Sequence, residues 1–579
     1  MTLSLPVLAT LDATSLPGTV VHRHDPAEDA WWRQAVTYQI YPRSFADSTG
    51  NGIGDLPGAR AKLPYLVELG VDAVWFSPFY LSPQADGGYD VADYRAVDPL
   101  FGSLADFEGL LADATALGLK VIIDLVPNHT SDEHPWFQAA LAGGPGCPER
   151  ERYLFRDGLG AGGELPPNNW LSVFGGRGWT RVTEPDGTPG QWYLHLFDVK
   201  QPDLNWQHPQ VRAEFLDIID FWIRRGVAGF RVDVAHGLVK NPALPDWDGP
   251  QELLGPDDKQ PTNAAPMWDQ DGVHEIYSAW RARLDGYGEP DRIICAEGWV
   301  DPPERAVRYI RRDEFHQAFN FDFLECPWRA ADLREVVKKS WSMCDFVGAP
   351  TTWVLNNHDV VRSVSRLGLP IGEGRPNGIG SDDTQPDVVL GRRRARAATV
   401  LMLGLAGAAY LYQGEELGLP EVTDVPDELR EDPVFLRTDK REIGRDGCRV
   451  PLPWVHDAPG LGFGPTEATW LPQPAEFAKL AVDVQQGAAG STLELYRTLL
   501  RLRRERQLGL GSLAEVDGLG EHVVAYLNSG KDGAHPTLIV LNLGHEPVEL
   551  PAVGSVLVSS DAVAGTTLPG DTAAWLTVG

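Results

Sequence analysis

Residues 211–234 read VRAEFLDIIDFWIRRGVAGFRVDV, and two different periodicities follow one another in this stretch. The first part, residues 211–225, carries apolar side chains at three- and four-residue spacing, which places them on one face of a helix: Phe215, Ile218, Ile219 and Trp222. The second part, residues 229–234, is short and mixes β-branched and aromatic residues, which is typical of a strand. A helix that leads into a short buried strand indicates a parallel sheet with crossover helices.

The same alternation extends in both directions along the chain and predicts eight strands in all. We expect them at residues 35–41, 73–79, 120–126, 229–234, 292–296, 317–323, 352–356 and 408–411. Eight strands separated by helices close naturally into a barrel. The predicted fold class is therefore α/β, a (β/α)8 TIM barrel.

Two segments do not follow the alternation. Residues 130–203 are polar and rich in glycine and proline, and they are too long for a plain loop in a compact domain. We predict an inserted domain B here, which overhangs the carboxyl ends of the strands. After a helix over residues 493–507, alternating strands predict an antiparallel C-terminal β-domain over 510–579, with strands at residues 522–528, 538–543, 556–559 and 573–578.

The remaining boundaries follow from these two segments. The catalytic barrel is expected over residues 31–129 and 204–509, and residues 1–30 form an N-terminal extension whose first 28 residues show no strong pattern.

Composition excludes several classes of protein. The chain has 579 residues and a formal charge of −31, from 81 acidic against 50 basic residues, which repels nucleic acid and anionic membranes. There is no basic leader followed by an apolar stretch, and no run of about 18 apolar residues. The five cysteines lack CxxC spacing, so neither a disulfide framework nor a zinc site is indicated. We therefore predict a cytoplasmic protein without nucleic-acid or membrane partners.

Polar residues close four of the predicted strands, at the end of a parallel barrel where reacting groups lie. They are Asp124, Asn128 and His129 after the third strand, Arg231 and Asp233 on the fourth, Glu297 after the fifth, and Asn357, His358 and Asp359 after the seventh.

The acids among them differ in their surroundings. Arg231 and Asp233 lie on the same side of a strand, so the guanidinium is expected to hold the carboxylate ionised, as a nucleophile must be. Glu297 lies among apolar residues, which raises its pKa and suits a general acid. A retaining glycosidase needs such a pair about 5 Å apart. Asp359 is expected to hold sugar hydroxyls in the transition state.

Any one of these acids, taken alone, is better explained as a helix cap or a solvated loop residue. His129 and His358, taken alone, are equally well explained as ordinary hydrogen-bonding histidines. The prediction of a reactive site depends on several acids lying together at strand ends.

These segments resemble the four signature regions of the α-amylase superfamily, glycoside hydrolase family 13, and the resemblance extends from about Trp32 to the C-terminus. It implies that Asp233 is the catalytic nucleophile, that Glu297 is the acid/base, and that Asp359 is a third carboxylate which fixes the sugar. It also implies that one glucose subsite is lined by His129, Arg231 and His358.

Further segments resemble the oligo-1,6-glucosidase and α-glucosidase branch of this family. Residues 201–206, QPDLNW, are similar to the fifth signature region of this branch. Gly88-Tyr89-Asp90, after the second strand, also matches the branch. In that branch the Tyr stacks on the terminal sugar and the Asp binds its outer hydroxyls. The segment 445–449 resembles the one whose second arginine, here Arg449, completes the pocket. Phe174 and Phe197 form its aromatic wall by the same resemblance, or they are simply core residues.

A glycine-rich stretch offers oxygen ligands at alternating positions, as calcium loops do: Asp47, Thr49, Asn51, Ile53 and Asp55. The branch has a divalent-ion site here, so the resemblance implies a structural Ca²⁺ or Mg²⁺. A solvated glycine-rich turn is the alternative. No cofactor is expected in the chemistry, because the glycosidic step uses carboxylates alone.

The predicted function is a retaining, exo-acting α-glucosidase that removes α-1,4-linked glucose from maltose and short malto-oligosaccharides through a covalent glucosyl-enzyme intermediate. Two alternatives within the family stay open. Val234 after the nucleophile is typical of α-1,6-acting relatives, whereas the segments 233–237 and 447–454 resemble actinobacterial-type maltases. A transglucosylase or sucrose-isomerase-type enzyme would share the same residues.

A non-catalytic role is a remote alternative. Some relatives serve as binding subunits of membrane transporters, but those carry a membrane segment and lack the acids. Whether the chain forms a monomer or a homo-oligomer is not predicted.

Overall fold

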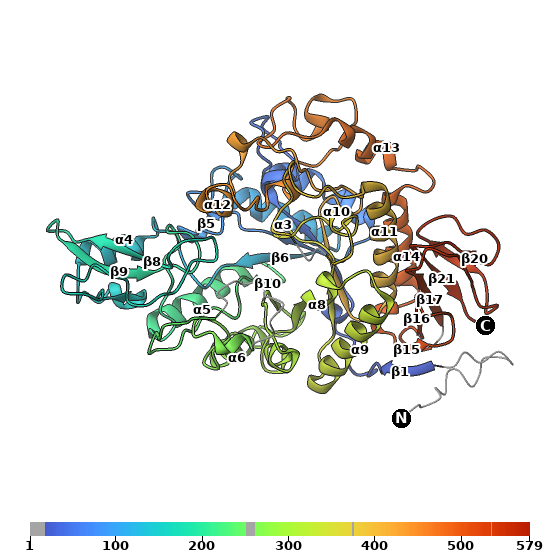
Figure 1. Cartoon of the computed structure of the whole chain (residues 1–579), viewed down its shortest axis with the longest axis horizontal. Helices are drawn as coiled ribbons and strands as arrows, with labels where there is room; N and C mark the ends of the chain where they lie inside the picture. Colours follow the sequence, from blue (N-terminus) through green and yellow to red (C-terminus); the bar gives the residue numbers. More distant parts are fainter. Residues whose placement is uncertain (1–17, 250–260, 373–375, 534) are drawn as a thin grey trace.

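The computed structural model describes residues 18–249, 261–372, 376–533 and 535–579. Its centre is a closed barrel of eight parallel strands, which confirms the predicted fold class (Figure 1). In chain order the strands are β2 (Val36–Ile40), β3 (Ala73–Phe76), β6 (Lys120–Leu125), β10 (Gly229–Val232), β11 (Ile293–Ala296), β12 (Gln317–Asn320), β13 (Thr352–Val354) and β14 (Ala408–Tyr412). All eight lie where the sequence predicts a strand.

Helices connect these strands and surround the barrel. The larger ones are α3 (Leu104–Ala116), α5 (Pro209–Ile223), α6 (Val273–Asp285), α9 (Ala330–Val347), α11 (Val388–Gly404) and α14 (Thr492–Glu505). The predicted apolar face of α5 is buried: Phe215, Ile218, Ile219 and Trp222 are each at most 1% exposed. Burying four such side chains contributes several kcal/mol, at about 2 kcal/mol each. This burial fixes the orientation of the helix that leads into β10.

The sixth strand is shorter than predicted. It ends at Asn320, and helix α8 (Phe321–Glu325) begins where the sequence predicted three more strand residues. The side chain of Asn320 accepts a hydrogen bond from the backbone N–H of Phe323 at 3.0 Å, which caps the new helix. Phe321 and Phe323 are therefore buried as part of a helical turn.

The segment between β6 and α5 carries helix α4 (Pro135–Gly143) and a small antiparallel sheet, on the left in Figure 1. The sheet has the order β7-β9-β8, from β7 (Phe155–Arg156), β8 (Trp179–Thr183) and β9 (Pro189–Leu194). A buried ion pair of 2.6 Å between Lys240 and Asp203 ties the end of this segment to the loop after β10. Its loops can therefore be held over the carboxyl ends of the strands.

The C-terminal region forms a six-stranded sheet, on the right in Figure 1, with the order β1-β15-β16-β17-β21-β19. Four of its strands lie where predicted: β16 (Val523–Asn528), β17 (Thr537–Asn542), β19 (Val556–Ser559) and β21 (Thr572–Thr577). The sheet packs on the barrel through α11, since the indole N–H of Trp575 donates to the carbonyl of Val400 at 2.8 Å.

The sheet also contains strands that the sequence did not reveal. They are β15 (Leu513–Val516) and β1 (Gly18–His22), which pair antiparallel with Gly18 opposite Val516. A short pair, β18 (Val548–Glu549) with β20 (Thr567–Leu568), lies beside it. Strand β1 gives no local signal because its partner is about 500 residues away in the sequence. Residues 1–17 of the N-terminal extension lie outside the described residues.

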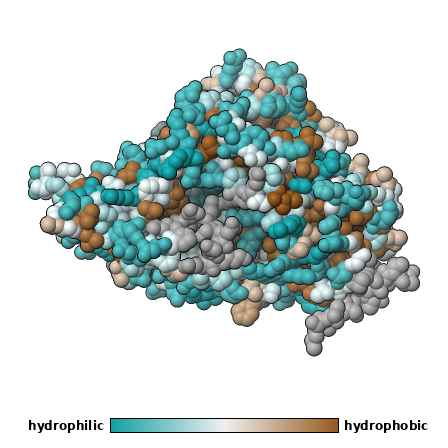
Figure 2. Space-filling model, in the orientation of Figure 1, coloured by the Kyte–Doolittle hydropathy of each residue, from teal (hydrophilic) through white to brown (hydrophobic). Residues whose placement is uncertain are grey.

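Hydrophilic side chains dominate the face shown in Figure 2, and apolar residues are scattered over it, as expected for a chain of charge −31. Among the described residues, no helix is both long and apolar enough to cross a membrane. The five cysteines are unpaired.

Candidate active site

A pocket of about 120 Å³ lies at the carboxyl ends of the barrel strands. It brings together seven of the predicted site residues: Tyr89, His129, Phe174, Phe197, Asp233, Glu297 and Asp359. The other side chains that line it are Asp86, Val173, Val234, Trp299, Asn377, Val434 and Arg445. Residues from six separate loops thus converge on a space the size of a small ligand.

The register of two neighbouring strands sets the positions of Asp233 and Glu297. Val232 on β10 is paired with Ala296 on β11, so the next residues along, Asp233 and Glu297, emerge side by side. Neighbouring strands are about 4.8 Å apart, close to the separation of the two carboxyl groups in retaining glycosidases. The backbone N–H of Val234 donates to Glu297 Oε2 at 2.8 Å and fixes that side chain.

Arg231 lies beneath the pocket and is shared by several carboxylates. Its Nη1 is 2.7 Å from Asp233 and 3.0 Å from Asp124, and its Nη2 is 3.8 Å from Glu297. Asp124 is fully buried and contacts the same Nη1 atom, so it competes with Asp233 for the positive charge of Arg231. The guanidinium therefore cannot neutralise Asp233 completely.

The sequence-based expectation for Asp233, that Arg231 holds its carboxylate ionised, is opposed mainly by burial. Burial raises the pKa of Asp233 above its usual range, and Glu297, Asp124 and Asp359 add to the effect, although Arg231 opposes it. Burial also raises the pKa of Glu297, as predicted. Of the two, Asp233 has the closer contact with Arg231, which favours its ionised form.

Asp359 has the opposite electrostatic setting. Burial by itself would raise its pKa, but His358, Arg445 and Arg449 outweigh burial and lower the pKa. Arg445 and Arg449 contact its Oδ1 at 3.0 and 2.9 Å. The side chain is one-third exposed, at 33%, so an ionised carboxylate faces the pocket.

His358 lies behind Asp359, on the side away from the pocket. Its ring is stacked between Tyr41 and Tyr89, with ring centroids 5.7 and 5.3 Å away, and its Nδ1 is 2.7 Å from the side-chain amide of Gln39. Burial lowers the pKa of His358 well below its usual range, so the imidazole is neutral. Its Nε2 lies 3.2 Å from Asp359.

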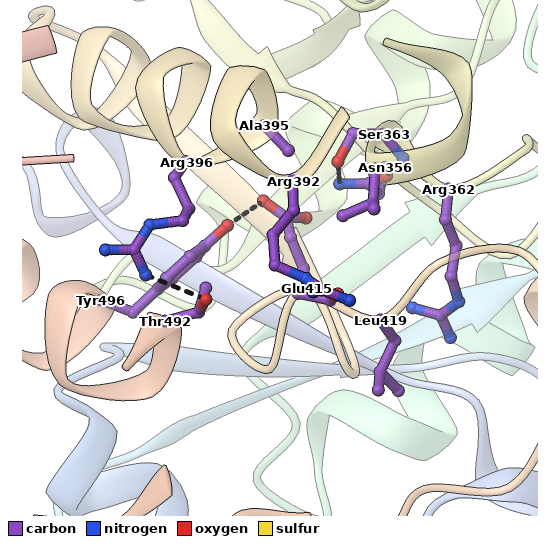
Figure 3. A pocket seen from close by; sticks show the side chains of 12 residues that line it. Asn356, Arg362, Ser363, Arg392, Ala395, Arg396, Glu415, Leu419, Thr492 and Tyr496 are labelled. Carbon is purple, nitrogen blue, oxygen red and sulfur yellow. Dashed lines mark hydrogen bonds between the residues drawn. The ribbon is translucent and has the colours of Figure 1, made fainter. Parts of the chain in front are cut away.

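The loop that carries His358 and Asp359 is braced from behind. Asn356, at its start, exchanges hydrogen bonds with Ser363 at 3.1 and 2.5 Å (Figure 3). Below it, the buried carboxyl of Glu415 accepts from Tyr496 at 2.9 Å. Asn356 also hydrogen-bonds the Glu415 carboxyl, so Glu415 links the loop to α14.

The structure corrects the predicted role of Asp90. This side chain is fully buried, and its oxygens accept the backbone N–H groups of Ala85 and Asp86 at 2.9 and 3.0 Å. Asp86 faces the pocket instead and contacts Arg445 at 2.8 Å. Asp86 begins the same segment as Tyr89, so the motif indicated the loop but not which acid points inward.

Arg449 is a second residue whose predicted place in the pocket is taken by a neighbouring residue. Arg445, the first arginine of the segment 445–449, lines the pocket, while Arg449 lies below and holds Asp359 and the carbonyl of His358. Arg445 also binds Asp432 at 2.7 Å, a residue that the sequence did not single out. Its guanidinium lies 5.2 Å from the ring centre of Phe174.

Phe174 and Phe197 are wall residues of this pocket. Their rings meet edge to face with centroids 5.6 Å apart, and Phe197 also packs against His129 at 5.2 Å. Burial lowers the pKa of His129 to about 4, so this imidazole is neutral too. The apolar wall faces the acids across the pocket.

The predicted cation loop is folded around its two acids. Asp47 accepts the N–H groups of Thr49, Gly50 and Gly52, each at 2.8 Å, and Asp55 accepts those of Ser48 and Gly58. Asp47 Oδ1 and Thr49 Oγ1 lie 3.1 Å apart, as two ligands of one ion can. Backbone donors also satisfy these carboxylates, as a plain turn requires. A structural Ca²⁺ or Mg²⁺, held by Asp47, Thr49, Asn51, Ile53 and Asp55, stays a prediction.

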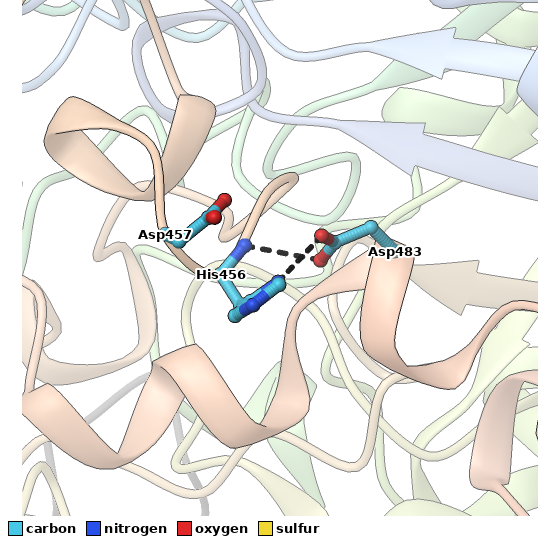
Figure 4. A group of neighbouring side chains, drawn as sticks. All are labelled: His456, Asp457 and Asp483. Atoms are coloured by element: carbon cyan, nitrogen blue, oxygen red, sulfur yellow. Dashed lines mark hydrogen bonds and ion pairs between the residues drawn. The ribbon is translucent and has the colours of Figure 1, made fainter.

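A second group of metal-type side chains lies at the surface, at His456, Asp457 and Asp483 (Figure 4). Their ligand atoms lie within 4.8 Å of one another, and all three residues are exposed. His456 Nδ1 is paired with Asp483 at 2.7 Å, which explains the arrangement as an ordinary surface ion pair.

Comparison with known proteins agrees with this fold. Residues 39–510 match the family model of the alpha amylase catalytic domain. The chain is 37% identical to an oligo-1,6-glucosidase of Parageobacillus thermoglucosidasius, over 83% of this chain and 85% of the relative. It is 35% identical to Maltase 1 of Drosophila virilis, over 89% of this chain and 79% of the relative.

A solved structure gives the same result. The crystal structure of an alpha-glucosyl transfer enzyme, XgtA, superimposes with a TM-score of 0.80 at 37% identity and covers 95% of this chain and all of that chain. The chain belongs to the alpha-amylase family of glycoside hydrolases, family 13.

Proposed function

We propose that the protein is an exo-acting, retaining α-glucosidase that removes terminal α-1,4-linked glucose from maltose and short malto-oligosaccharides. One observation carries the exo-action: Arg445 joins Asp86 to Asp359 across the end of the pocket, with Phe174 beside it. An oligosaccharide that enters is blocked beyond its first ring.

The polar groups at the closed end provide for a terminal sugar. Asp86 and Asp359 are acceptors and Arg445 is a donor, so together they can bind hydroxyls of the non-reducing ring. His358, Arg445 and Arg449 lower the pKa of Asp359, which favours the strong, charge-assisted hydrogen bonds that hold a distorted ring. These contacts position the anomeric carbon over Asp233.

In the first half of the proposed reaction, the Asp233 carboxylate attacks the anomeric carbon while Glu297 donates its proton to the departing oxygen. A covalent glucosyl ester at Asp233 results, and the shortened sugar leaves. Arg231 stabilises the attacking carboxylate at 2.7 Å, and the raised pKa of Glu297 favours its protonated form.

In the second half, the ionised Glu297 takes a proton from water, which attacks the same carbon and breaks the ester. Glucose leaves with its original anomeric configuration, and Glu297 is protonated again. The chain supplies all acids and bases that these steps need.

Linkage preference is the finer part of the proposal. Val234, which lines the pocket, favours α-1,6 bonds by its resemblance to that group of relatives, and the similarity to an oligo-1,6-glucosidase supports the same alternative. The segments 233–237 and 447–454 and the similarity to a maltase support α-1,4 bonds. Glucosyl transfer is a second candidate, supported by the likeness to an alpha-glucosyl transfer enzyme.

In this proposal two long loops, residues 241–272 and 372–387, shape the acceptor side of the pocket. The structure describes them only in part, because residues 250–260 and 373–375 lie outside the described residues.

The deciding experiment is incubation with maltose, isomaltose, trehalose, sucrose and maltotriose, followed by chromatography of glucose and of new disaccharides. Stoichiometric glucose from maltose and maltotriose supports the proposal. A clear preference for isomaltose would show α-1,6 specificity, as Val234 indicates. New disaccharides in place of glucose would show glucosyl transfer. No turnover of any of the five contradicts a glucosidase acting on these bonds.

A further inference from the structure

Arg437 joins the loop after β14 to the inserted segment between β6 and α5. It is the last residue of helix α12 (Pro433–Arg437), and its side chain is 20% exposed. Its Nε and Nη2 atoms donate to the backbone carbonyl of Gly175 at 3.2 and 2.9 Å. Its Nη1 atom donates to the carboxylate of Asp198 at 3.4 Å. One side chain therefore binds the inserted segment at two separate places.

Both partners directly follow a phenylalanine of the pocket wall. Gly175 comes after Phe174, and Asp198 comes after Phe197. The two loops are also linked to each other, since the hydroxyl of Ser172 donates to the carbonyl of Phe197 at 2.7 Å. They form one unit, which Arg437 anchors to α12. A guanidinium is planar and presents its donors in a fixed fork, so this anchor sets a direction as well as a distance.

The same short helix fixes the charged side of the pocket. Asp432 caps α12, because one of its carboxylate oxygens accepts the backbone N–H of Val434 at 2.9 Å. Its other oxygen accepts from Nε of Arg445 at 2.7 Å. The separation of Arg445 from the ring of Phe174 is thus set by contacts at both ends of one helix.

The two segments approach each other closely at Gly175. A Cβ atom at this position would lie 3.1 Å from Cγ2 of Thr438, the residue after Arg437. Gly175 also has a φ of 95°, a conformation that favours glycine. The missing side chain therefore permits the contact that brings its carbonyl to Arg437.

We propose that Arg437 is a positioning residue for the aromatic wall, which it holds at the distance from Arg445 that receives one terminal sugar ring. It does not line the pocket itself, so it acts through Phe174 and Phe197. This inference rests on the proposed function, because it assigns a determinant of the same sugar site. A wall touches the sugar in much the same way before and during bond cleavage, so its displacement weakens binding more than it slows the chemistry.

The first test compares KM and kcat on maltose and on an aryl α-glucoside for wild type, Arg437→Met and Arg437→Lys. Methionine removes every donor, whereas lysine keeps the charge without the fork. We expect KM to rise about tenfold in Arg437→Met and about threefold in Arg437→Lys, with kcat within about twofold of wild type. Arg441→Met is the matched control: this exposed arginine donates to the carbonyl of Thr438 in its own loop at 2.9 Å, so KM should not change.

A variant on the other side of the contact keeps Arg437 intact. In Gly175→Ala the new methyl group presses on Thr438, so KM should rise as it does in Arg437→Met. The double variant Gly175→Ala/Arg437→Met should raise KM by less than the product of the two single effects, because both changes break the same contact.

The second test needs no substrate. Hydrogen–deuterium exchange of the free enzyme is followed in peptides that cover residues 171–177 and 196–199. Faster exchange in both regions in Arg437→Met, but not in Arg441→Met, supports the proposal together with the rise in KM. Unchanged exchange at the wall, or a KM that stays at the wild-type value, overturns it, because Arg437 is then only a structural contact. A wild type that turns over no glucoside would refute the proposed function, and exchange at the wall would then decide the role of Arg437.

Discussion

The guanidinium of Arg445 lies 2.8 Å from the carboxylate of Asp86, which is 359 positions away in the sequence. The same guanidinium contacts Asp359 at 3.0 Å and Asp432 at 2.7 Å. Three acids around one arginine make a rigid end to the pocket. They also explain why the chain binds one terminal sugar in our proposal rather than the middle of a polymer.

We expect Asp86→Asn to lower kcat/KM on maltose by about 100-fold, since removing one partner of a buried charge pair costs about 2–5 kcal/mol. Asp90→Asn is the matched control. Asp90 accepts only backbone N–H groups. Asp90→Asn should therefore lower the melting temperature and leave kcat/KM close to that of wild type. The reverse pattern would restore Asp90 as the sugar-binding acid.

Asp233→Asn and Glu297→Gln should each reduce kcat on maltose by at least about 10³-fold, because each removes a group that makes or breaks a bond. Both changes are nearly isosteric, so circular dichroism and the melting temperature should stay close to wild type. Near-normal turnover in either variant would remove that residue from the mechanism.

Val234→Ala should raise the ratio of kcat/KM for maltose to that for isomaltose by about tenfold, in the range that a methylene contributes to specificity. Val234 lines the pocket and has a left-handed backbone with φ of 45°, which is uncommon for a β-branched residue. Alanine tolerates this backbone better, so folding should not suffer. An unchanged ratio would show that other residues select the linkage.

Stability should fall as pH rises through neutrality, because of the brace behind the Asp359 loop. Burial raises the pKa of Glu415 to about 7, so this carboxyl favours folding at low pH and loses that contribution as pH rises. Chemical denaturation between pH 5 and 8 should show that the free energy of unfolding of Glu415→Gln rises relative to that of wild type as pH rises. The relative rise should be at most about 1.4 kcal/mol per pH unit. For Glu476→Gln, a change at an exposed residue, the free energy of unfolding should follow the same pH dependence as in wild type. If Glu415→Gln also follows the wild-type pH dependence, Glu415 is not the group that makes stability fall with pH.

Chelation tests the predicted Ca²⁺ or Mg²⁺ loop. If the loop binds an ion, treatment with EDTA should lower the melting temperature, and saturating Ca²⁺ or Mg²⁺ should restore about 2.7 kcal/mol at 100 times the Kd. Asp47→Asn should abolish the restoration, whereas His456→Ala should not. Restoration lost in His456→Ala alone would move the ion to the surface group of Figure 4.

The amino-acid sequence by itself determined the barrel and its reactive edge. The period of the apolar residues in 211–225 and the short strand after it are local signals, and eight such units have one natural closure. Asp233, Glu297 and Asp359 were predictable for the same reason, since each lies at the end of a strand. Parallel strands put these ends together whatever the details of packing.

Only the tertiary structure decided which side chains face the pocket and how charge is shared there. Asp86 and Asp90 lie in one short loop, and the hydrogen bonds of Asp90 to the backbone determine that Asp86 points inward. Arg231 serves three carboxylates, so its effect on Asp233 depends on distances that no local pattern encodes. Strand β1 is likewise set by a partner about 500 residues away. Periodicity records which face of an element is buried, whereas these outcomes depend on contacts between elements that meet only after folding.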